Sequence, residues 1–155
     1  MKISVLGMGY VGLSTATMLS TKYNVICHDI DESKLESIER RRSPIKDKLI
    51  SEFFKSKKLK LKTSIKINYE ISQSDFIIIS TPTNFQTSTN MFNTISVDKI
   101  LKKLSIMKSN SIIIIKSTLP VGYTAQVNKR FKNLKIYFSH EFLREGRALY
   151  DNLFP

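Results

Sequence analysis

Short runs of β-branched residues alternate with helical segments along this chain. We expect strands over residues 2–6, 24–28, 76–80, 111–116 and 135–138. We expect helices over residues 11–21, 32–40, 46–56, 97–107 and 124–131. Strand–helix–strand alternation of this kind is typical of βαβ units, so the pattern predicts an α/β fold with a mainly parallel sheet.

Two of the predicted strands are unbroken apolar runs. Ile77 to Ile79 and Ile112 to Ile115 show no alternation between apolar and polar positions. Continuous runs suit strands that are buried on both faces, which predicts helices on both sides of the sheet. A long polar segment at residues 84–94 follows one of these strands. Ligands of open α/β sheets lie outside the carboxyl ends of the strands, so this segment fits either a ligand-facing loop or an ordinary surface loop.

Composition limits the class of protein. The chain has 155 residues, of which 41% are hydrophobic and 25% charged, and this predicts one soluble domain over residues 1–155. The densest apolar runs are too short to cross a bilayer, and the start lacks a stretch of signal-peptide length. We therefore expect a cytoplasmic protein with no membrane partner.

The net charge of +12 raises the alternative of a nucleic-acid partner. Several lysines do cluster, at Lys55, Lys57, Lys58, Lys60 and Lys62. They fall where a helix is expected to end and the next strand to begin, with no basic helix and no interleaved aromatic residues. We favour lysines on solvent-exposed faces, or an anionic small ligand, and expect no nucleic-acid partner.

Cysteine and histidine are scarce. The single cysteine, Cys27, excludes an internal disulfide and a cysteine-based metal cluster. Inside a predicted strand it is expected to be a small buried hydrophobic residue, not a nucleophile. His28 is expected to lie in a strand and to form a hydrogen bond with a neighbouring group. With His140 as the only other histidine, we expect no bound metal.

The stretch GMGYVG begins directly after the first predicted strand and opens an apolar helix. Gly7 permits a tight turn, Gly9 lets the backbone approach a pyrophosphate, and Gly12 allows close packing of helix and strand. The amides at the helix start and the helix dipole would attract the phosphates. A glycine-rich turn without a ligand is the alternative, but strand, glycines and helix in this order favour a Rossmann-like, doubly wound nucleotide-binding fold.

An acidic residue is expected about 20 residues further on, at the end of the second strand. Asp29 stands there. Its carboxylate would accept hydrogen bonds from both ribose hydroxyls and repel a 2′-phosphate, so NAD is preferred to NADP. Lys34, at the start of the next helix, would reach the same ribose or point to solvent.

Three further polar stretches follow predicted strands: Thr81-Pro82-Thr83, Ser117 to Gly122, and Glu141 to Gly146. Taken singly, each fits local capping or turn chemistry. Taken together, GMGYVGL, STPT, KSTLPVGYT and EFLREGRALYDN resemble the nucleotide-sugar dehydrogenases, and among them most the UDP-glucose 6-dehydrogenases of the short bacterial type. The resemblance covers essentially the whole chain.

The resemblance implies an N-terminal NAD-binding domain and a reaction in which UDP-glucose is oxidised twice at its 6-hydroxymethyl group. GDP-mannose or a UDP-N-acetyl-hexosamine is the alternative substrate, and a non-catalytic NAD-binding module the alternative class. The cofactor-binding residues that it implies are Gly7, Gly9, Tyr10, Val11, Gly12, Asp29, Lys34, Thr81, Thr83, Thr118 and Glu145. The catalytic residues that it implies are Thr118, Glu141 and Glu145. The sugar pocket is expected to include Glu141, Phe142, Leu143, Arg144 and Glu145.

The chain departs from the family pattern in two ways. His140 stands where the family usually has a proline, which loosens the backbone ahead of Glu141. The family's thiol nucleophile, central helix and UDP-binding domain lie beyond residue 155, so we expect this chain to bind NAD without turnover. The family pairs through the central helix as a homodimer. We therefore expect this chain to be a monomer with apolar surface exposed around Leu149, Tyr150, Leu153 and Phe154.

Overall fold

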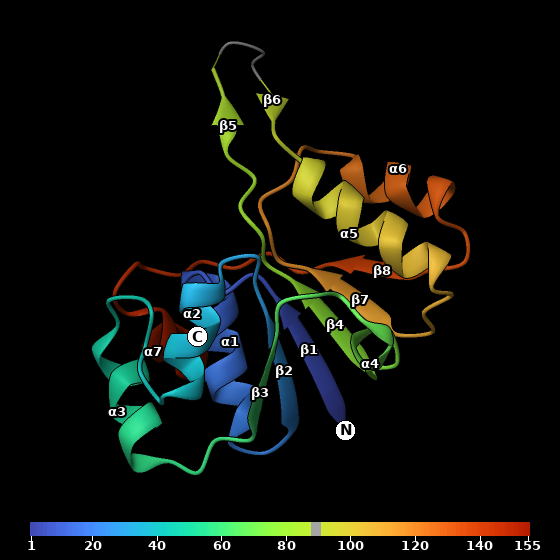
Figure 1. The fold of residues 1–155 in the computed structure, drawn as a ribbon. Coiled ribbons are helices and arrows are strands. Elements are labelled where there is room, and N and C mark those ends of the chain that lie inside the picture. The colour runs from blue at the N-terminus through green and yellow to red at the C-terminus, as the bar shows by residue number, and fades with distance from the viewer. Residues whose placement is uncertain (88–90) are drawn as a thin grey trace.

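The computed structural model describes residues 1–87 and 91–155 (Figure 1). Its main sheet has six strands in the order β3-β2-β1-β4-β7-β8, and every neighbouring pair is parallel. The strands are β1 (Lys2–Leu6), β2 (Asn24–His28), β3 (Leu61–Ser64), β4 (Phe76–Ile79), β7 (Ile112–Ile115) and β8 (Lys135–Phe138). The chain builds outward from β1 in one direction and then from β4 in the other. The predicted doubly wound parallel sheet is confirmed.

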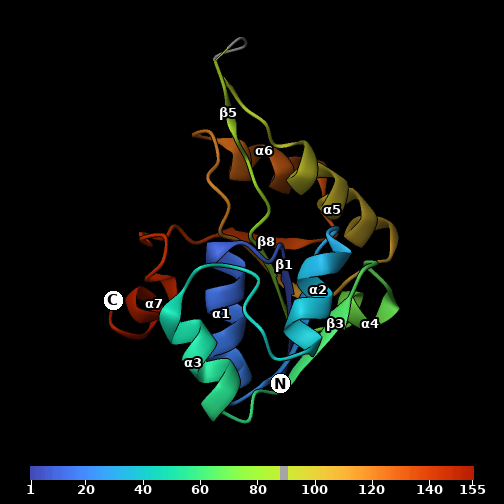
Figure 2. The same cartoon turned by 60° about the vertical axis from the view of Figure 1, so that its left-hand side comes forward.

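Helices cover both faces of this sheet (Figures 1 and 2). One face carries α1 (Tyr10–Ser20), α2 (Glu32–Glu39), α3 (Lys48–Ser56) and α7 (Ala148–Leu153). The other carries α4 (Tyr69–Ser72), α5 (Ile95–Ile106) and α6 (Tyr123–Arg130). The alternation of side chains along a strand supplies both layers, because successive residues point to opposite faces. In β4, Ile77 and Ile79 pack into the α5–α6 layer, whereas Ile78 packs into the α1 layer.

Helix α1 lies deepest in the fold, between the sheet, α3 and α7. Most of its residues are buried, including the hydroxyl-bearing Ser14, Thr17 and Ser20. Each of these hydroxyls donates to a carbonyl oxygen of the helix itself, over 2.7–3.0 Å. Burial of these three hydroxyls is therefore offset by local hydrogen bonds, whereas the buried Thr15 hydroxyl has no partner among the described residues.

The expected strands and helices are all present, with ends shifted by at most two residues. Four features were not expected in detail, and one of them is the short helix α7. A third strand, β3, pairs with β2, and the short α4 follows it. The segment expected to be one polar loop instead contains an antiparallel hairpin, β5 (Phe85–Gln86) and β6 (Met91–Phe92), which projects from the body in Figure 1. The prediction for residues 88–90 falls outside the described residues.

The expectation of exposed apolar surface near residue 155 is wrong in part. Leu149 is fully buried, because α7 packs against α1 and α3. Its backbone amide donates to the buried Asp47 carboxylate over 3.3 Å, and the Asn152 side chain donates to Ser14 over 2.9 Å. Leu153 is half-buried, whereas Tyr150 and Phe154 are exposed, as expected.

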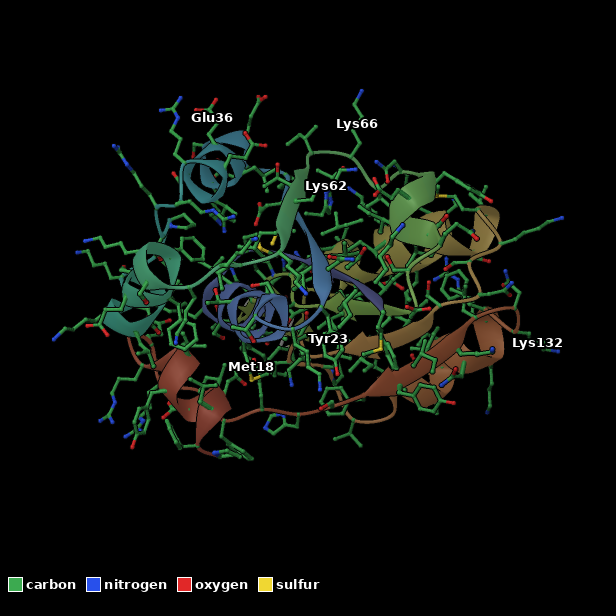
Figure 3. The ribbon with its side chains drawn as sticks, turned by 90° about the horizontal axis from the view of Figure 1, so that it is seen from below. Met18, Tyr23, Glu36, Lys62, Lys66 and Lys132 are labelled. Atoms are coloured by element: carbon green, nitrogen blue, oxygen red, sulfur yellow. The ribbon has the colours of Figure 1, made fainter. Side chains whose placement is uncertain are left out.

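Charged side chains are spread over the outside of the fold. Lys66 and Lys132 point away from the ribbon in Figure 3, as does Glu36, and Lys62 is exposed. Lys62 forms an ion pair with Glu70 at 2.5 Å. In the described part of the chain, no helix has the length and apolarity needed to cross a bilayer. No group of three potential metal ligands comes together in residues 1–87 and 91–155.

Candidate functional site

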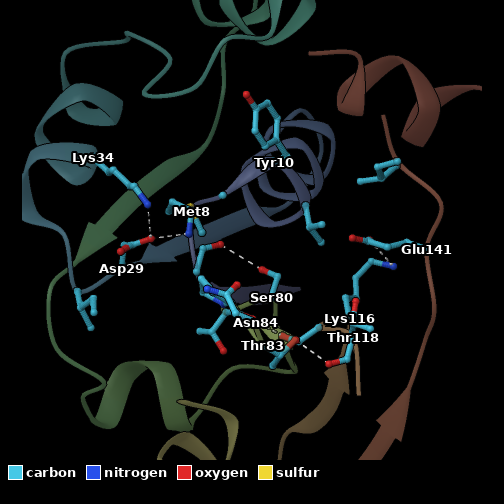
Figure 4. Close-up of a pocket in the computed structure, with 18 of the residues that line it drawn as sticks. Met8, Tyr10, Asp29, Lys34, Ser80, Thr83, Asn84, Lys116, Thr118 and Glu141 are labelled. Carbon is cyan, nitrogen blue, oxygen red and sulfur yellow. Dashed lines mark hydrogen bonds and ion pairs between the residues drawn. The ribbon is translucent and has the colours of Figure 1, made fainter. Parts of the chain in front are cut away.

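A cavity of about 610 Å³ opens at the carboxyl ends of β1, β2, β4 and β7. The glycine-rich turn and Asp29 form one side of it, and Lys116, Thr118 and Glu141 form the other (Figure 4). A second hollow of about 610 Å³ adjoins it, sharing Gly7, Asp29 and Ile30, and extends toward α5. The site is therefore elongated and crosses the point where the strand order reverses, which is where open α/β sheets bind their ligands.

The turn after β1 is built around Gly7. Its φ of 98° lies in the left-handed region, and a Cβ atom there would come within 2.6 Å of the Ser80 carbonyl oxygen. The Gly7 amide donates to the carbonyl oxygen of His28 over 2.8 Å, and the Ser80 hydroxyl donates to that of Gly7 over 3.1 Å. The turn thus ties together the ends of β1, β2 and β4, as the tight turn predicted for Gly7 requires.

Gly9 differs because nothing in residues 1–87 and 91–155 requires a glycine there. Its φ of −84° is open to any residue, and a Cβ atom would meet no atom within 4 Å. Gly9 also caps α1 without a side-chain hydrogen bond. In the part of the chain that the structure describes, the amides of Tyr10 and Val11 have no acceptor. Bare amides beside an open surface that a Cβ would fill are what a bound pyrophosphate needs, so the cradle fits a dinucleotide.

Asp29 stands opposite this cradle, at the end of β2, and is 8% exposed. Its Oδ2 accepts from the Met8 amide over 2.6 Å, and its Oδ1 accepts from the Asp31 amide over 3.0 Å. The Lys34 ammonium lies 3.7 Å from Oδ2. Two backbone donors thus orient the carboxylate and leave it further lone pairs for a ribose diol. The Lys34 side chain is 34% exposed beside Asp29, and its contact with a ribose remains a prediction.

The loops after β4 and β7 are joined by short hydrogen bonds. The Thr83 hydroxyl donates to the Thr118 carbonyl oxygen over 2.6 Å, and the Ser117 hydroxyl donates to that of Thr81 over 2.8 Å. Thr81 also shares a hydrogen bond of 3.0 Å with Ser96 on α5. The predicted Thr81, Thr83 and Thr118 are therefore brought together in the cavity wall.

The far side of the cavity holds a buried pair of opposite charges. The Lys116 ammonium lies 3.2 Å from the Glu141 Oε2, and the two side chains are 15% and 10% exposed. In the described residues, Lys116 is the one donor that approaches the Glu141 oxygens, so most of their acceptor capacity is unused. Burial raises the pKa of Glu141, and the charge of Lys116 acts against that rise. The site thus contains a carboxylate with unmet acceptor capacity.

The predicted segment 141–145 is divided by the structure. Glu141 and Leu143 line the cavity. Phe142 is 88% exposed, and Glu145 is exposed and lies outside the cavity wall. Arg144 forms an ion pair with Asp151 at 2.6 Å, and the pKa of Asp151 falls to about 2 because Arg144 hydrogen-bonds it. The roles of Phe142, Arg144 and Glu145 remain predictions.

Sequence reasoning missed Lys116 as a site residue. Its signal was present, since Lys116 follows directly after the isoleucine strand and so stands at the carboxyl end of β7. His140 lines the same wall and packs edge-on against the Phe142 ring, with centroids 4.6 Å apart. The prediction that Cys27 is a buried residue inside a strand is confirmed. Cys27 is fully buried, and burial raises the pKa of its thiol to about 12.

These features define a class of protein. A glycine turn into a helix start, an acid at the end of the neighbouring strand and a sheet of this order make a Rossmann dinucleotide-binding domain. The family is shown by sequence. The chain belongs to the UDP-glucose/GDP-mannose dehydrogenase family, whose NAD-binding-domain model matches residues 1–155, and its cofactor is NAD.

Curated relatives agree with this family. The chain is 45% identical to a UDP-glucose 6-dehydrogenase of Campylobacter jejuni and 43% identical to one of Streptococcus pneumoniae. Each match covers 100% of this chain but only 40% and 39% of those two proteins.

Solved structures share the fold. A GDP-mannose dehydrogenase from Pseudomonas aeruginosa superposes with a TM-score of 0.85 at 21% identity, over 100% of this chain and 39% of that one. A UDP-N-acetyl-mannosamine dehydrogenase from Staphylococcus aureus gives a TM-score of 0.78 at 25% identity, over 97% of this chain and 38% of that one.

Proposed function

We propose that this chain is the NAD-binding domain of a UDP-glucose 6-dehydrogenase. The observation that carries this proposal is the 45% and 43% identity, over the whole chain, to two proteins of that name. The reaction converts the 6-hydroxymethyl group of the sugar to a carboxylate. One water is consumed, two NAD⁺ become two NADH, and three protons are released per carboxylate formed.

One end of the site would hold the cofactor. The amides of Tyr10 and Val11 would donate to the pyrophosphate, with Gly9 allowing its approach. Asp29, oriented by its two backbone donors, would accept from the ribose hydroxyls, and Lys34 would add a donor there. Thr83 and Thr118 would line the nicotinamide side. When bound, NAD supplies the acceptor for hydride in each oxidation.

The other end would act on the sugar. Glu141 would accept a proton or a hydrogen bond from a water or hydroxyl, and its lining of the same cavity as Thr118 supports this role. Leu143 would contribute apolar contact in the cavity. Phe142, Arg144 and Glu145 lie on the exposed side of this segment. We propose that they contact substrate or cofactor together with other parts of the whole protein.

Cys27 does not supply the nucleophile. It is buried inside β2, and burial raises the pKa of its thiol to about 12, so it is not a thiolate near neutral pH. We therefore expect the 155-residue chain to bind NAD but to form no NADH from UDP-glucose. Steady NADH formation by these residues alone would contradict this expectation. Sedimentation of the same sample tests whether the chain is a monomer.

Calorimetric titration with NAD tests the cofactor site. Asp29→Asn keeps the size of the side chain and one acceptor oxygen, but removes the charge. It should weaken NAD binding by about 1–3 kcal/mol, the scale of a charge-assisted hydrogen bond. NADP should bind more weakly than NAD to the unchanged chain. Glu36→Gln, on the exposed side of α2, is the matched control and should leave the affinity unchanged. If Asp29→Asn binds NAD as tightly as the unchanged chain, the Asp29 carboxylate does not bind the ribose.

The nucleotide sugar needs a separate test. The family also includes GDP-mannose dehydrogenases, and both that sugar and a UDP-N-acetyl-hexosamine remain alternatives to UDP-glucose. The whole protein that contains these residues should be assayed for NADH formation with each of the three substrates. Highest kcat/KM with UDP-glucose supports the proposal. A preference for either alternative keeps the family and changes the substrate, and NAD binding without any turnover indicates a non-catalytic module.

A further inference from the structure

Lys116 and Glu141 form a buried ion pair in the cavity wall, and such a pair can hold a carboxylate in a fixed position. Both side chains are nearly nine-tenths buried, and they come from separate elements, the end of β7 and the segment after β8. Their charged ends lie 3.2 Å apart in the wall of the cavity. Figure 4 shows the pair on the side of the cavity opposite Asp29 and Lys34.

The pair is incomplete as a purely structural ion pair. Buried ion pairs stabilise a fold only when further hydrogen bonds satisfy the remaining lone pairs and protons. Both Glu141 oxygens are closed to bulk water, and in the described residues no donor other than Lys116 approaches them. Leaving a buried carboxylate in that condition costs stability, which is typical of a group kept for function.

The neighbours of Glu141 leave Lys116 as its main support. The charged or titratable groups that act on the carboxylate are Lys116 and His140, and the effect of Lys116 is the larger. His140 adjoins Glu141 in the chain, and its ring packs against Phe142. Lys116 alone reaches the carboxylate as an ion pair in the described residues.

We propose that Lys116 is a positioning residue, whose ammonium group holds the Glu141 carboxylate in the cavity wall as an ionised hydrogen-bond acceptor for a substrate hydroxyl or a water. This inference deepens the proposed function, because it assigns the group that prepares Glu141 for its role. Lys116 acts here through Glu141, so its loss should change the protonation of that carboxyl group. A lysine that does not act on this carboxylate, such as the exposed Lys132, would not have this effect.

The test follows the Glu141 carboxyl carbon by NMR in the 155-residue chain labelled with ¹³C-glutamate, with Glu141→Gln used for assignment. In Lys116→Met the midpoint of the Glu141 titration, and so its pKa, should rise by about 1–3 pH units, the scale for losing an opposite charge at this distance. Lys116→Arg should restore most of the original value. The matched control is Lys132→Met, which removes an exposed lysine.

An unchanged midpoint in Lys116→Met, or an equal change in Lys132→Met, overturns the inference. Should Lys116→Met fail to fold, Lys116→Gln retains a polar side chain without the charge and is read in the same way. The readout needs no cofactor and no turnover. Unchanged NAD affinity in Asp29→Asn would count against the proposed function. An unchanged pH titration of Glu141 in Lys116→Met would count only against the role of Lys116.

Discussion

A Cβ atom on Gly12 would lie 1.8 Å from the carbonyl oxygen of Gly7 and 2.4 Å from the hydroxyl oxygen of Ser80. The first turn of α1 is thus pressed against the turn that leaves β1, with no space between them. Gly9, three residues before Gly12, faces open space instead. The three glycines of one motif therefore meet different demands, and substitution separates those that serve the fold from the one that serves the ligand.

Gly12→Ala should destabilise the fold. The added methyl group meets backbone, which cannot rotate away, so helix and turn must move apart. We expect a loss of about 3 kcal/mol or more in the free energy of unfolding, the upper range for overpacking. Urea unfolding followed by circular dichroism measures it. Stability within error of the parent chain would contradict the packing described here.

Gly9→Ala should spare the fold and impair the ligand. Its backbone conformation suits alanine, so the free energy of unfolding should fall by about 1 kcal/mol or less, the scale of the weaker capping by alanine. The new methyl group occupies the cradle, and NAD affinity should fall about tenfold or more, equivalent to 1.4 kcal/mol. Calorimetry measures the affinity, with Gly12→Ala as the contrasting variant. Unchanged affinity would show that the pyrophosphate does not use this surface.

The sequence was enough to predict those strands and turns whose structure depends mainly on residues close together in the chain. The range of β1 and that of β2 were predicted without error, because each is a short apolar run bounded by polar residues or glycine. The position of Asp29 followed from the same reasoning. The φ of Gly7 and the open space at Gly9 agree with the roles that the motif predicted.

The parts that were missed depend on residues far apart in the chain. The ion pair of Lys116 with Glu141 joins β7 to the segment after β8, and no local spacing encodes it. The β5–β6 hairpin lies in a polar segment, and its Phe85–Phe92 ring contact at 5.2 Å is visible only once the chain turns back. Helix α7 has only six residues and is held by contacts to α1 and α3.

Leu149→Ala tests the placement of α7. The side chain is fully buried beneath α1 and α3, so its truncation should lower the free energy of unfolding by about 2–5 kcal/mol. Tyr150→Ala, at the exposed neighbouring position, is the control and should cost clearly less. Denaturant unfolding of both variants provides the comparison. Equal losses would mean that α7 does not hold its position in solution.

His28 should make the stability of the fold depend on pH. In the folded chain, burial lowers the pKa of His28, and Lys103 adds to this, whereas the hydrogen bond to Ser64 and the charge of Asp29 act in the opposite direction. In the unfolded chain a histidine titrates near pH 6.5, so the unfolded state takes up a proton first as the pH falls. Stability should therefore decline as the pH falls below about 6.5, until the folded-state pKa is passed.

His28→Asn isolates this contribution. The Nδ1 of His28 lies 2.7 Å from the Ser64 carbonyl oxygen, and an asparagine amide can donate to the same acceptor without titrating. Urea unfolding between pH 7.5 and 5 should show the parent chain losing stability relative to His28→Asn, by about 1.4 kcal/mol for each unit of pKa difference between the two states. His140→Asn serves as the control, since it removes the other histidine and leaves His28 in place. Parallel curves for the parent chain and His28→Asn would contradict the lowered pKa.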